Sequence, residues 1–177
     1  MSQQEPVIVH LDAEYGPRAR NRLAEAASPD LGGARAALET FYYAFNHRDA
    51  DVFERVWVRD PLVQLNNPLG GMLRGADDIT ALYQRIFNSP ARVEVSFGDA
   101  VAYQAAGMVV FAGRETGQFT DPAGRNVPLR IRTTRVFAYD QAAGRWGQVH
   151  HHGSIDEPDA LRDYQHAVAA NGQHGTG

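Results

Sequence analysis

Apolar residues recur every three or four positions in the first half of the chain and every second position in the second half. The first spacing predicts amphipathic helices, and the second predicts strands with one buried face. Three segments have the helical spacing, with apolar positions Leu38, Phe41, Tyr42 and Phe45; Val52, Phe53, Val56 and Trp57; and Ile79, Leu82, Tyr83, Ile86 and Phe87. Asp49 can cap the second helix, and Pro61 and Pro90 stop the second and third. Between them, 62–65 should be extended and 66–71 should form a turn.

From residue 92 the spacing changes to two, beginning with Val93, Val95 and Phe97. The pattern predicts strands at 93–97, 100–104, 108–119, 127–139 and 145–155, with turns at Gly98-Asp99, Gly107, 121–124 and 140–144. Because no helix separates these strands, they should pair as an antiparallel meander. An eleven-residue strand is about 36 Å long, so such strands must twist and bend. The order of elements predicts an α+β domain, in which three N-terminal helices pack on a curved antiparallel sheet.

The two ends of the chain differ from this central pattern. Residues 1–33 contain several prolines and the pair Gly32-Gly33, and we expect a partly ordered extension with a short helix from Pro17 to Ala27. Residues 34–156 should hold the α+β domain. In residues 157–177 the pattern predicts a last helix over 157–170, followed by a frayed tail rich in Gly and Gln.

The composition narrows the class of protein. At 177 residues the chain is the size of one domain, and it has no cysteine, which excludes disulfides and thiolate chemistry. Its net charge of −4 is spread over both signs, so nucleic acid and anionic membranes are not expected partners. The N-terminus lacks a secretory signal pattern, and no run approaches the roughly 20 apolar residues of a membrane span. These features predict a cytoplasmic protein.

Four stretches, at 41–50, 73–79, 134–137 and 145–154, together resemble the nuclear transport factor 2-like superfamily. The chain is most similar to its SnoaL-like domains and to the association domain of calcium/calmodulin-dependent protein kinase. The most specific stretch is Arg145-Trp146-Gly147-Gln148-Val149-His150-His151-His152-Gly153-Ser154. The resemblance implies a cystatin-like, cone-shaped fold that encloses a cavity and forms a homodimer through its sheet. The family includes isomerases, cyclases, dehydratases, hydrolases and non-catalytic scaffolds, so the fold alone does not identify the function.

Arg135 is the one charge on an otherwise apolar strand face, shared with Leu129, Ile131, Thr133, Phe137 and Tyr139. A buried cation needs an anionic partner. That partner is either a ligand carboxylate, held by the planar guanidinium, or an internal acid, with Glu115 and Asp99 as the candidates. The kinase association domain has an arginine at the matching position, in a pocket that resembles an anion site. Gly153 stands where that family has a second pocket arginine.

The triplet His150-His151-His152 lies on the last predicted strand. Alternation groups His150 and His152 with Trp146 and Ser154, and it groups His151 with Val149 and Gly153 on the side that the resemblance assigns to the pocket. We therefore expect His151 to be the catalytic acid–base residue. Hydrogen bonding within the sheet or an interface is the alternative for the other two. An H-x-H pair can also bind a metal, but no further ligand signature accompanies it, and we expect neither metal nor organic cofactor.

Aromatic residues should line the helix side of the cavity, among them Tyr43, Trp57 and Tyr83, unless they are plain core. Tyr83 matches a pocket tyrosine of the association domain, so it should offer its hydroxyl to a ligand. Asn66 stands where relatives place a polar pocket residue, and Asn67 follows it; turn formation is the alternative for both.

Three functions follow from these residues. The first is a binding domain for a small organic acid or polyketide-like molecule, anionic or carbonyl-bearing, on which His151 transfers a proton in an isomerisation, dehydration or cyclisation. The second is a non-catalytic association module with a vestigial cavity. The third, which ranks last, is a metal-dependent enzyme that uses the histidine triplet. The sequence does not decide whether the protein is an enzyme.

Overall fold

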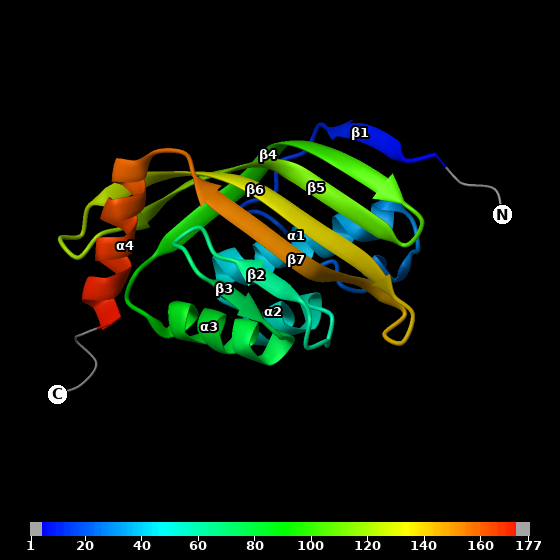
Figure 1. Cartoon of the computed structure of the whole chain (residues 1–177), viewed down its shortest axis with the longest axis horizontal. Helices are drawn as coiled ribbons and strands as arrows, with labels where there is room; N and C mark the ends of the chain where they lie inside the picture. Colours follow the sequence, from blue (N-terminus) through cyan, green and yellow to red (C-terminus); the bar gives the residue numbers. More distant parts are fainter. Residues whose placement is uncertain (1–4, 173–177) are drawn as a thin grey trace.

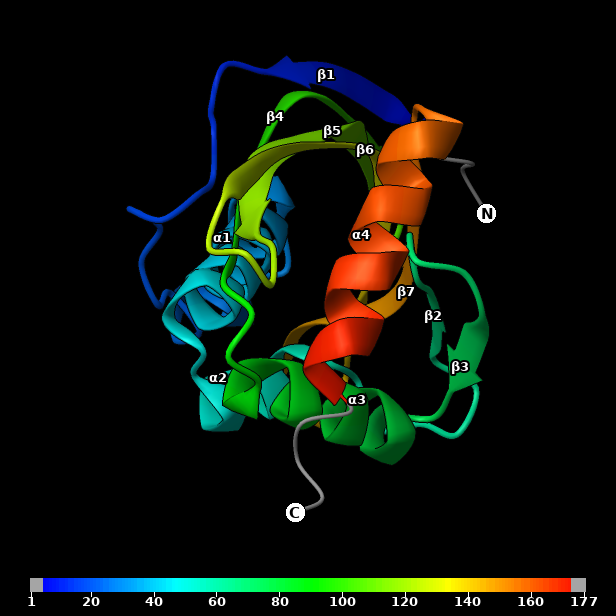
Figure 2. The ribbon, with the colours of Figure 1, turned by 90° about the vertical axis from the view of Figure 1, so that its left-hand side faces the viewer.

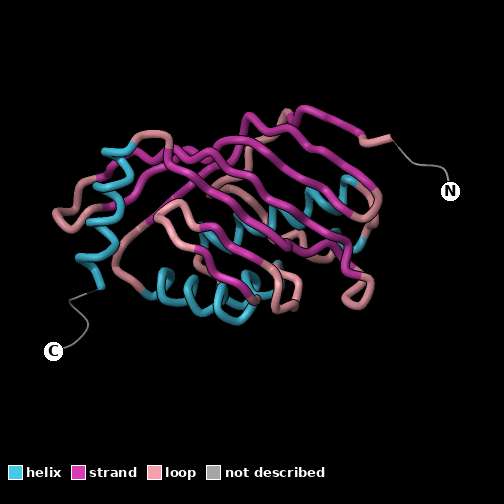
Figure 3. The backbone as a smooth tube through the Cα atoms, in the orientation of Figure 1, coloured by secondary structure: helices cyan, strands magenta, loops and turns pink. Residues whose placement is uncertain are grey.

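The computed structural model describes residues 5–172, and it has a layer of helices beneath one curved sheet (Figures 1 and 3). The sheet contains seven strands in the order β1-β4-β5-β6-β7-β2-β3. The elements are β1 (Val7–Leu11), a 3-10 helix (Glu25–Ala27), α1 (Leu31–His47), α2 (Ala50–Val56), β2 (Gln64–Asn66), β3 (Met72–Arg74), α3 (Ala76–Asn88), β4 (Val93–Ala105), β5 (Met108–Thr120), β6 (Asn126–Asp140), β7 (Arg145–Ile155) and α4 (Pro158–Gly172). The predicted α+β class and the packing of three helices on a curved sheet are confirmed. None of the helices in this part of the chain is long and apolar enough to cross a membrane.

The helices begin where side chains satisfy their first backbone N–H groups. Asp30 accepts a 2.9 Å hydrogen bond from the Gly33 N–H at the start of α1, and Asp49 accepts one of 3.0 Å from the Val52 N–H at the start of α2. The apolar stripes of α1 to α3 then face the sheet, where Phe41, Phe53 and Ile79 are almost completely buried.

The long strands β4 to β7 pair antiparallel, as predicted, but β4 is one strand and the predicted turn at Gly98-Asp99 is wrong. Asp99 is instead the extra residue of a bulge, with a φ of 46°, and β4 continues on both sides of it. A bulge and a turn share the same sequence signal, a glycine next to a residue that tolerates positive φ, so alternation alone cannot separate them.

A second bulge in β7 changes which residues face the helices. Val136 of β6 pairs with His150, whereas the next residue, Phe137, pairs with Gln148, so Val149 is inserted. Residues on the two sides of a bulge are out of step by one position. Gln148 therefore shares the inner face with His151, and the predicted grouping of Trp146 with His150 is wrong.

The N-terminal segment adds an edge strand to the sheet. β1 pairs antiparallel with β4, and Tyr15 makes a further backbone bridge to Phe97. The helix expected from Pro17 to Ala27 is absent from this described segment, which contains only the 3-10 turn at its end. β2 overlaps the extended segment predicted at 62–65, and the predicted turn at 66–71 leads into β3, which was not predicted because three residues are too few to show alternation. β2 pairs antiparallel with β3 and parallel with β7.

Helix α4 crosses the open end of the cone, from the sheet toward α3 (Figure 2). Tyr164 and Ala167 of this helix are buried, and the Tyr164 ring lies 4.7 Å from that of Phe119 on β5. The first and last elements, β1 and α4, lie at opposite ends of the molecule (Figure 1).

Candidate functional site

A buried ion pair occupies the inner face of the sheet. Arg135 of β6 is 1% exposed, and its Nη2 donates a 2.7 Å hydrogen bond to Oε1 of Glu115 on β5. Its Cζ atom lies 3.6 Å from the centre of the Phe41 ring, a geometry that favours a cation. Of the two internal partners considered from the sequence, Glu115 is therefore the one found, and Asp99 is exposed in the β4 bulge.

Two further side chains hydrogen-bond to this pair, and sequence reasoning missed both. The Tyr42 hydroxyl on α1 accepts from Arg135 Nε at 2.8 Å and donates to Glu115 Oε1 at 2.6 Å. Gln148 on β7 accepts from Arg135 Nη1 at 3.0 Å. The signal for Tyr42 was a hydroxyl on an otherwise apolar helix stripe. No such signal existed for Gln148, because it reaches the inner face only through the bulge.

Burial and charge set the protonation states in this cluster. Burial raises the pKa of Tyr42 well above its ordinary value, so this hydroxyl stays neutral and keeps its proton to donate. Burial by itself would lower the pKa of Arg135, but the interactions with Tyr42 and Glu115 outweigh burial and raise it. The guanidinium is therefore charged, and its charge is balanced within the protein.

His151 lies on β7 next to this cluster and is 3% exposed. Neither ring nitrogen has a hydrogen-bond partner within residues 5–172. Burial, followed by the Arg135 cation, holds the pKa of His151 well below its ordinary value. The ring is therefore neutral, with one nitrogen able to donate a hydrogen bond and the other able to accept one. Buried polar atoms are rarely left unpaired, so we expect the two ring nitrogens of His151 to hydrogen-bond to water or a ligand.

A cavity of about 50 Å³ lies between the sheet and α3. Its lining includes the polar residues Asn67, Tyr83, Glu115, Arg135, His151 and Tyr164. Burial raises the pKa of Tyr83, so its hydroxyl is neutral, and its ring stacks on Phe53 at 4.2 Å. The cavity has room for a few water molecules, whereas pockets for drug-sized ligands measure about 300–1,000 Å³.

The structure brings three of the predicted site residues together at this cavity: Arg135, Tyr83 and His151. Asn67 takes the place expected for Asn66, whose side chain accepts a 3.0 Å hydrogen bond from Gln64 instead. The part of the lining that the structure describes does not include Trp57 or Tyr43. Trp57 is buried at the end of α2, and Tyr43 stacks on His47 with ring centres 4.5 Å apart.

Close packing explains why position 153 is a glycine. A side chain there would place its Cβ atom 3.1 Å from Pro68 Cδ and 3.1 Å from Ile131 Cγ2. The loop that follows β2 therefore occupies the space that an arginine would need. The described lining of the cavity contains one arginine, and a side chain at position 153 would require Pro68 and Ile131 to shift.

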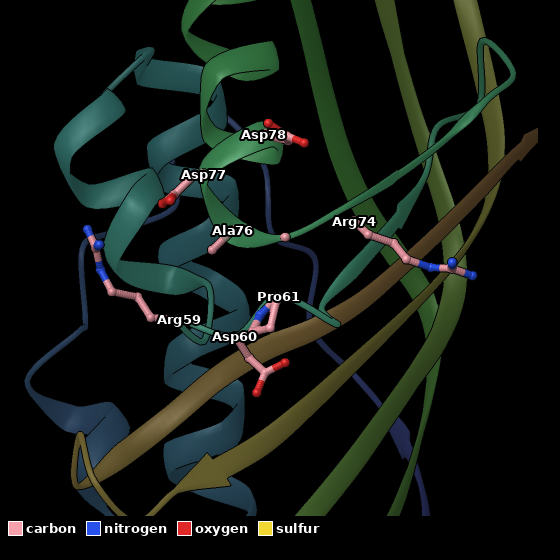
Figure 4. Close-up of a pocket in the computed structure, with 8 residues that line it drawn as sticks. Arg59, Asp60, Pro61, Arg74, Ala76, Asp77 and Asp78 are labelled. Atoms are coloured by element: carbon pink, nitrogen blue, oxygen red, sulfur yellow. The ribbon is translucent and has the colours of Figure 1, made fainter.

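A larger groove lies on the surface at the start of α3, with a volume of about 440 Å³ (Figure 4). Its basic side chains, Arg59 and Arg74, extend in opposite directions. Arg59 is paired with Glu54, and Asp60, Asp77 and Asp78 also line the groove. Acids and bases are therefore mixed along an open surface, and the groove lacks the buried polar groups that distinguish the cavity at His151.

The histidine triplet is divided between the two faces of the sheet. His151 faces the cavity, whereas His152 is exposed on the outer face and His150 makes a 3.1 Å hydrogen bond with the Gln64 carbonyl oxygen. Across the described residues, no three histidine, aspartate or glutamate side chains converge as metal ligands would.

Comparison with known proteins places this geometry in a family. Residues 34–157 match the SnoaL-like domain. A solved candidate association domain of calcium/calmodulin-dependent protein kinase type II from Thiobacillus denitrificans is 28% identical, with 70% of this chain and 94% of that chain covered and a TM-score of 0.57. Among functionally curated proteins, no sequence matches significantly.

Two more distant structures share the fold. A candidate dehydratase of the NTF2-like family from Streptomyces avermitilis is 18% identical, with 70% of this chain and 94% of that chain covered and a TM-score of 0.63. A protein with a cystatin-like fold from Caulobacter vibrioides is 21% identical, with 73% of this chain and 91% of that chain covered and a TM-score of 0.58. The predicted cystatin-like, NTF2-like fold is thereby confirmed.

Proposed function

Because the chain belongs to the SnoaL-like domain family, we propose that it binds a small, neutral, carbonyl-bearing molecule in the cone and that His151 transfers a proton on it. The observation that carries this proposal is the His151 ring, which is buried at a cavity with both nitrogens unpaired in the described structure. A neutral imidazole can accept a proton at physiological pH, and it can also donate one hydrogen bond.

The ion pair favours a neutral ligand over a carboxylate. Glu115, Tyr42 and Gln148 already occupy all three nitrogens of the Arg135 guanidinium. A ligand carboxylate would have to displace Glu115 or be buried beside it, and two adjacent carboxylates repel each other. Of the anionic and carbonyl-bearing ligands that the sequence allowed, the carbonyl compound therefore fits the site better.

The groups at the cavity suit proton transfer next to a carbonyl. His151 would take a proton from the carbon beside the carbonyl, and the C–H electron pair would move to form an enolate. The neutral Tyr83 hydroxyl would donate a hydrogen bond to the enolate oxygen. Return of the proton at another carbon completes an isomerisation. Loss of a β-hydroxyl group, which leaves as water with the proton from His151, completes a dehydration. Neither reaction needs an organic cofactor.

Exchange of deuterium into small ketones tests this function. Acetone and cyclopentanone are incubated with the protein in D2O, and loss of their α-proton signals is followed by ¹H NMR. The protein should accelerate the exchange, and His151→Gln should abolish the acceleration while His152→Gln on the outer face retains it. Thermal shift should also favour cyclopentanone over cyclopentanecarboxylate. Equal exchange with wild type and His151→Gln would exclude His151 as the base.

A second candidate function is non-catalytic association. It is favoured by the internally balanced Arg135 and the small cavity beside it, and by the 28% identical structure described as an association domain. The outer face of the sheet also carries a row of cross-strand neighbours without charge, namely Ile8, Tyr103, Val110 and Val136. Ile8 and Tyr103 are 63% and 43% exposed, and a homodimer through the sheet would cover them.

A further inference from the structure

We infer that α4 is a movable cap of the cone and that Tyr164 sets the size of the molecules that reach His151. The inference deepens the proposed function, on which it rests, because it concerns access to the same site. It arises from residues outside the 34–157 segment that matches the SnoaL-like domain, since α4 spans Pro158–Gly172.

Tyr164 forms part of the cavity wall. Its side chain lines the same cavity as His151, together with residues of α3 and the sheet, and it is 8% exposed. The ring packs on Phe119, 4.7 Å away, at the open end of the cone. In the proposed cap, Tyr164 narrows the connection between the cavity and solvent and limits the volume beside His151.

Few contacts hold the described side chains of α4 to the rest of the protein. Among the α4 side chains that the structure describes, Tyr164 and Ala167 are the buried ones, whereas ten residues of α1 are buried. A helix that buries so little surface opens more readily than the core does. One further contact ties α4 to the cavity rim, a 2.7 Å hydrogen bond from Gln165 Nε2 to the Leu69 carbonyl oxygen. Leu69 also lines the cavity, so this bond joins the cap to another part of the cavity wall.

The connection that precedes α4 has contacts of its own with the sheet. Asp156, in the connection between β7 and α4, forms ion pairs with Arg114 and, at 2.8 Å, with Arg132. The two arginines are paired cross-strand neighbours on β5 and β6. Movement of α4 would therefore pivot about residues 156–158, with the ring of Tyr164 swinging out of the cone. In the closed state the site admits molecules the size of a few waters, and larger ligands require the open state.

Covalent labelling of histidines tests the cap without any ligand. Diethyl pyrocarbonate modifies neutral, accessible imidazoles, and peptide mass spectrometry reports each histidine separately. In the wild-type chain His151 should react at least ten-fold more slowly than exposed His152. Tyr164→Ala should raise the rate at His151 at least ten-fold, and Gln165→Ala should raise it less. Asp163→Ala, a change at an exposed position of the same helix, should leave it unchanged.

Several results would overturn the cap. One is fast labelling of His151 in the wild-type chain; another is an unchanged rate in Tyr164→Ala with wild-type circular dichroism. If Tyr164→Ala does not fold, hydrogen exchange of the wild-type chain decides instead: α4 amides should exchange at least a hundred-fold faster than those of α1, and equal protection refutes a movable helix. Labelling that rises as expected without ketone exchange would retain the cap and reject the proposed function. Ketone exchange by the wild-type chain, with an unchanged labelling rate at His151 in Tyr164→Ala, would retain the proposed function and reject the cap.

Discussion

Arg135 and Glu115 form a 2.7 Å ion pair whose two side chains are 2% and 5% exposed, so each charge depends on the other for its stability in the core. Tyr42 bridges the pair, because its hydroxyl bonds to both members. Taking a pair of charges from water is costly, and the hydrogen bonds around them offset this cost only while all partners are present. The cluster therefore makes one side of the cavity rigid, beside the neutral ring of His151.

Removal of the cation should destabilise the fold strongly. In Arg135→Met the Glu115 carboxylate stays buried without its partner, and the free energy of unfolding should fall by about 3–5 kcal/mol. Urea unfolding at pH 7 measures the change. Arg130→Met is the matched control, because Arg130 lies on the outer face of the same strand and is exposed; its effect should stay within about 0.5 kcal/mol.

The double variant Arg135→Met/Glu115→Leu distinguishes the cost of losing the ion pair from the cost of burying an unpaired Glu115 carboxylate. With both charges removed, the stability should recover most of the loss seen in Arg135→Met, because apolar residues of similar volume can replace a buried pair. A double variant less stable than Arg135→Met would show that the pair itself stabilises the fold, contrary to this account.

Tyr42→Phe tests the bridging hydroxyl without changing the packing of the ring. The substitution leaves Glu115 without one donor and Arg135 Nε without its acceptor. Loss of hydrogen bonds to buried charged groups should lower the free energy of unfolding by about 1.5–3 kcal/mol. Tyr43→Phe, at the neighbouring half-buried position, serves as the control in the same urea experiment. Equal effects of the two changes would contradict the bridging role.

His151 should make the fold sensitive to mild acid. Because folding lowers the pKa of His151, the unfolded chain binds a proton at a higher pH than the folded chain does. Its contribution to stability is therefore complete above the ordinary pKa of about 6.5 and is lost as the pH falls below it, by up to about 1.4 kcal/mol per pH unit. Between pH 7 and pH 5, His151→Gln should lose about 2 kcal/mol less stability than the wild-type chain.

The measurement is urea unfolding at both pH values, with His152→Gln as the reference. His150, whose pKa burial also lowers, titrates in all three proteins and so cancels from the comparison. A His151→Gln variant with the full acid sensitivity of the wild-type chain would show that His151 is protonated in the fold.

A charge on the outer face should prevent association through the sheet. Tyr103 lies in the uncharged row of the outer face and is 43% exposed. If copies pair through this row, Tyr103→Glu buries two carboxylates in the interface, and sedimentation velocity should show a change from a dimer to the 19.5 kDa monomer. Gln118→Glu adds the same charge at the far end of the outer face and should leave the dimer intact. A wild-type monomer would exclude this mode of association.

The spacing of apolar residues determined the secondary structure of the central domain. The stripes of α1 to α3 and the alternation of β5 and β6 are local patterns, because each element needs one apolar face whatever it packs against. For the same reason the sequence placed Arg135 on a buried face, where the structure finds it. His151 was also expected to face inward, and it does.

The partners of these residues depended on the tertiary structure. The bulge at Val149 shifts the alternation of β7 by one residue and turns Gln148 toward Arg135, and no local pattern marks it. The choice of Glu115 over Asp99 follows from the register and curvature of the sheet, and the volume beside His151 follows from where Tyr164 of α4 lies. Apolar periodicity acts between neighbours in the chain, whereas hydrogen-bond partners and cavity walls come from segments far apart in sequence. Only the folded arrangement of those segments decides what surrounds His151.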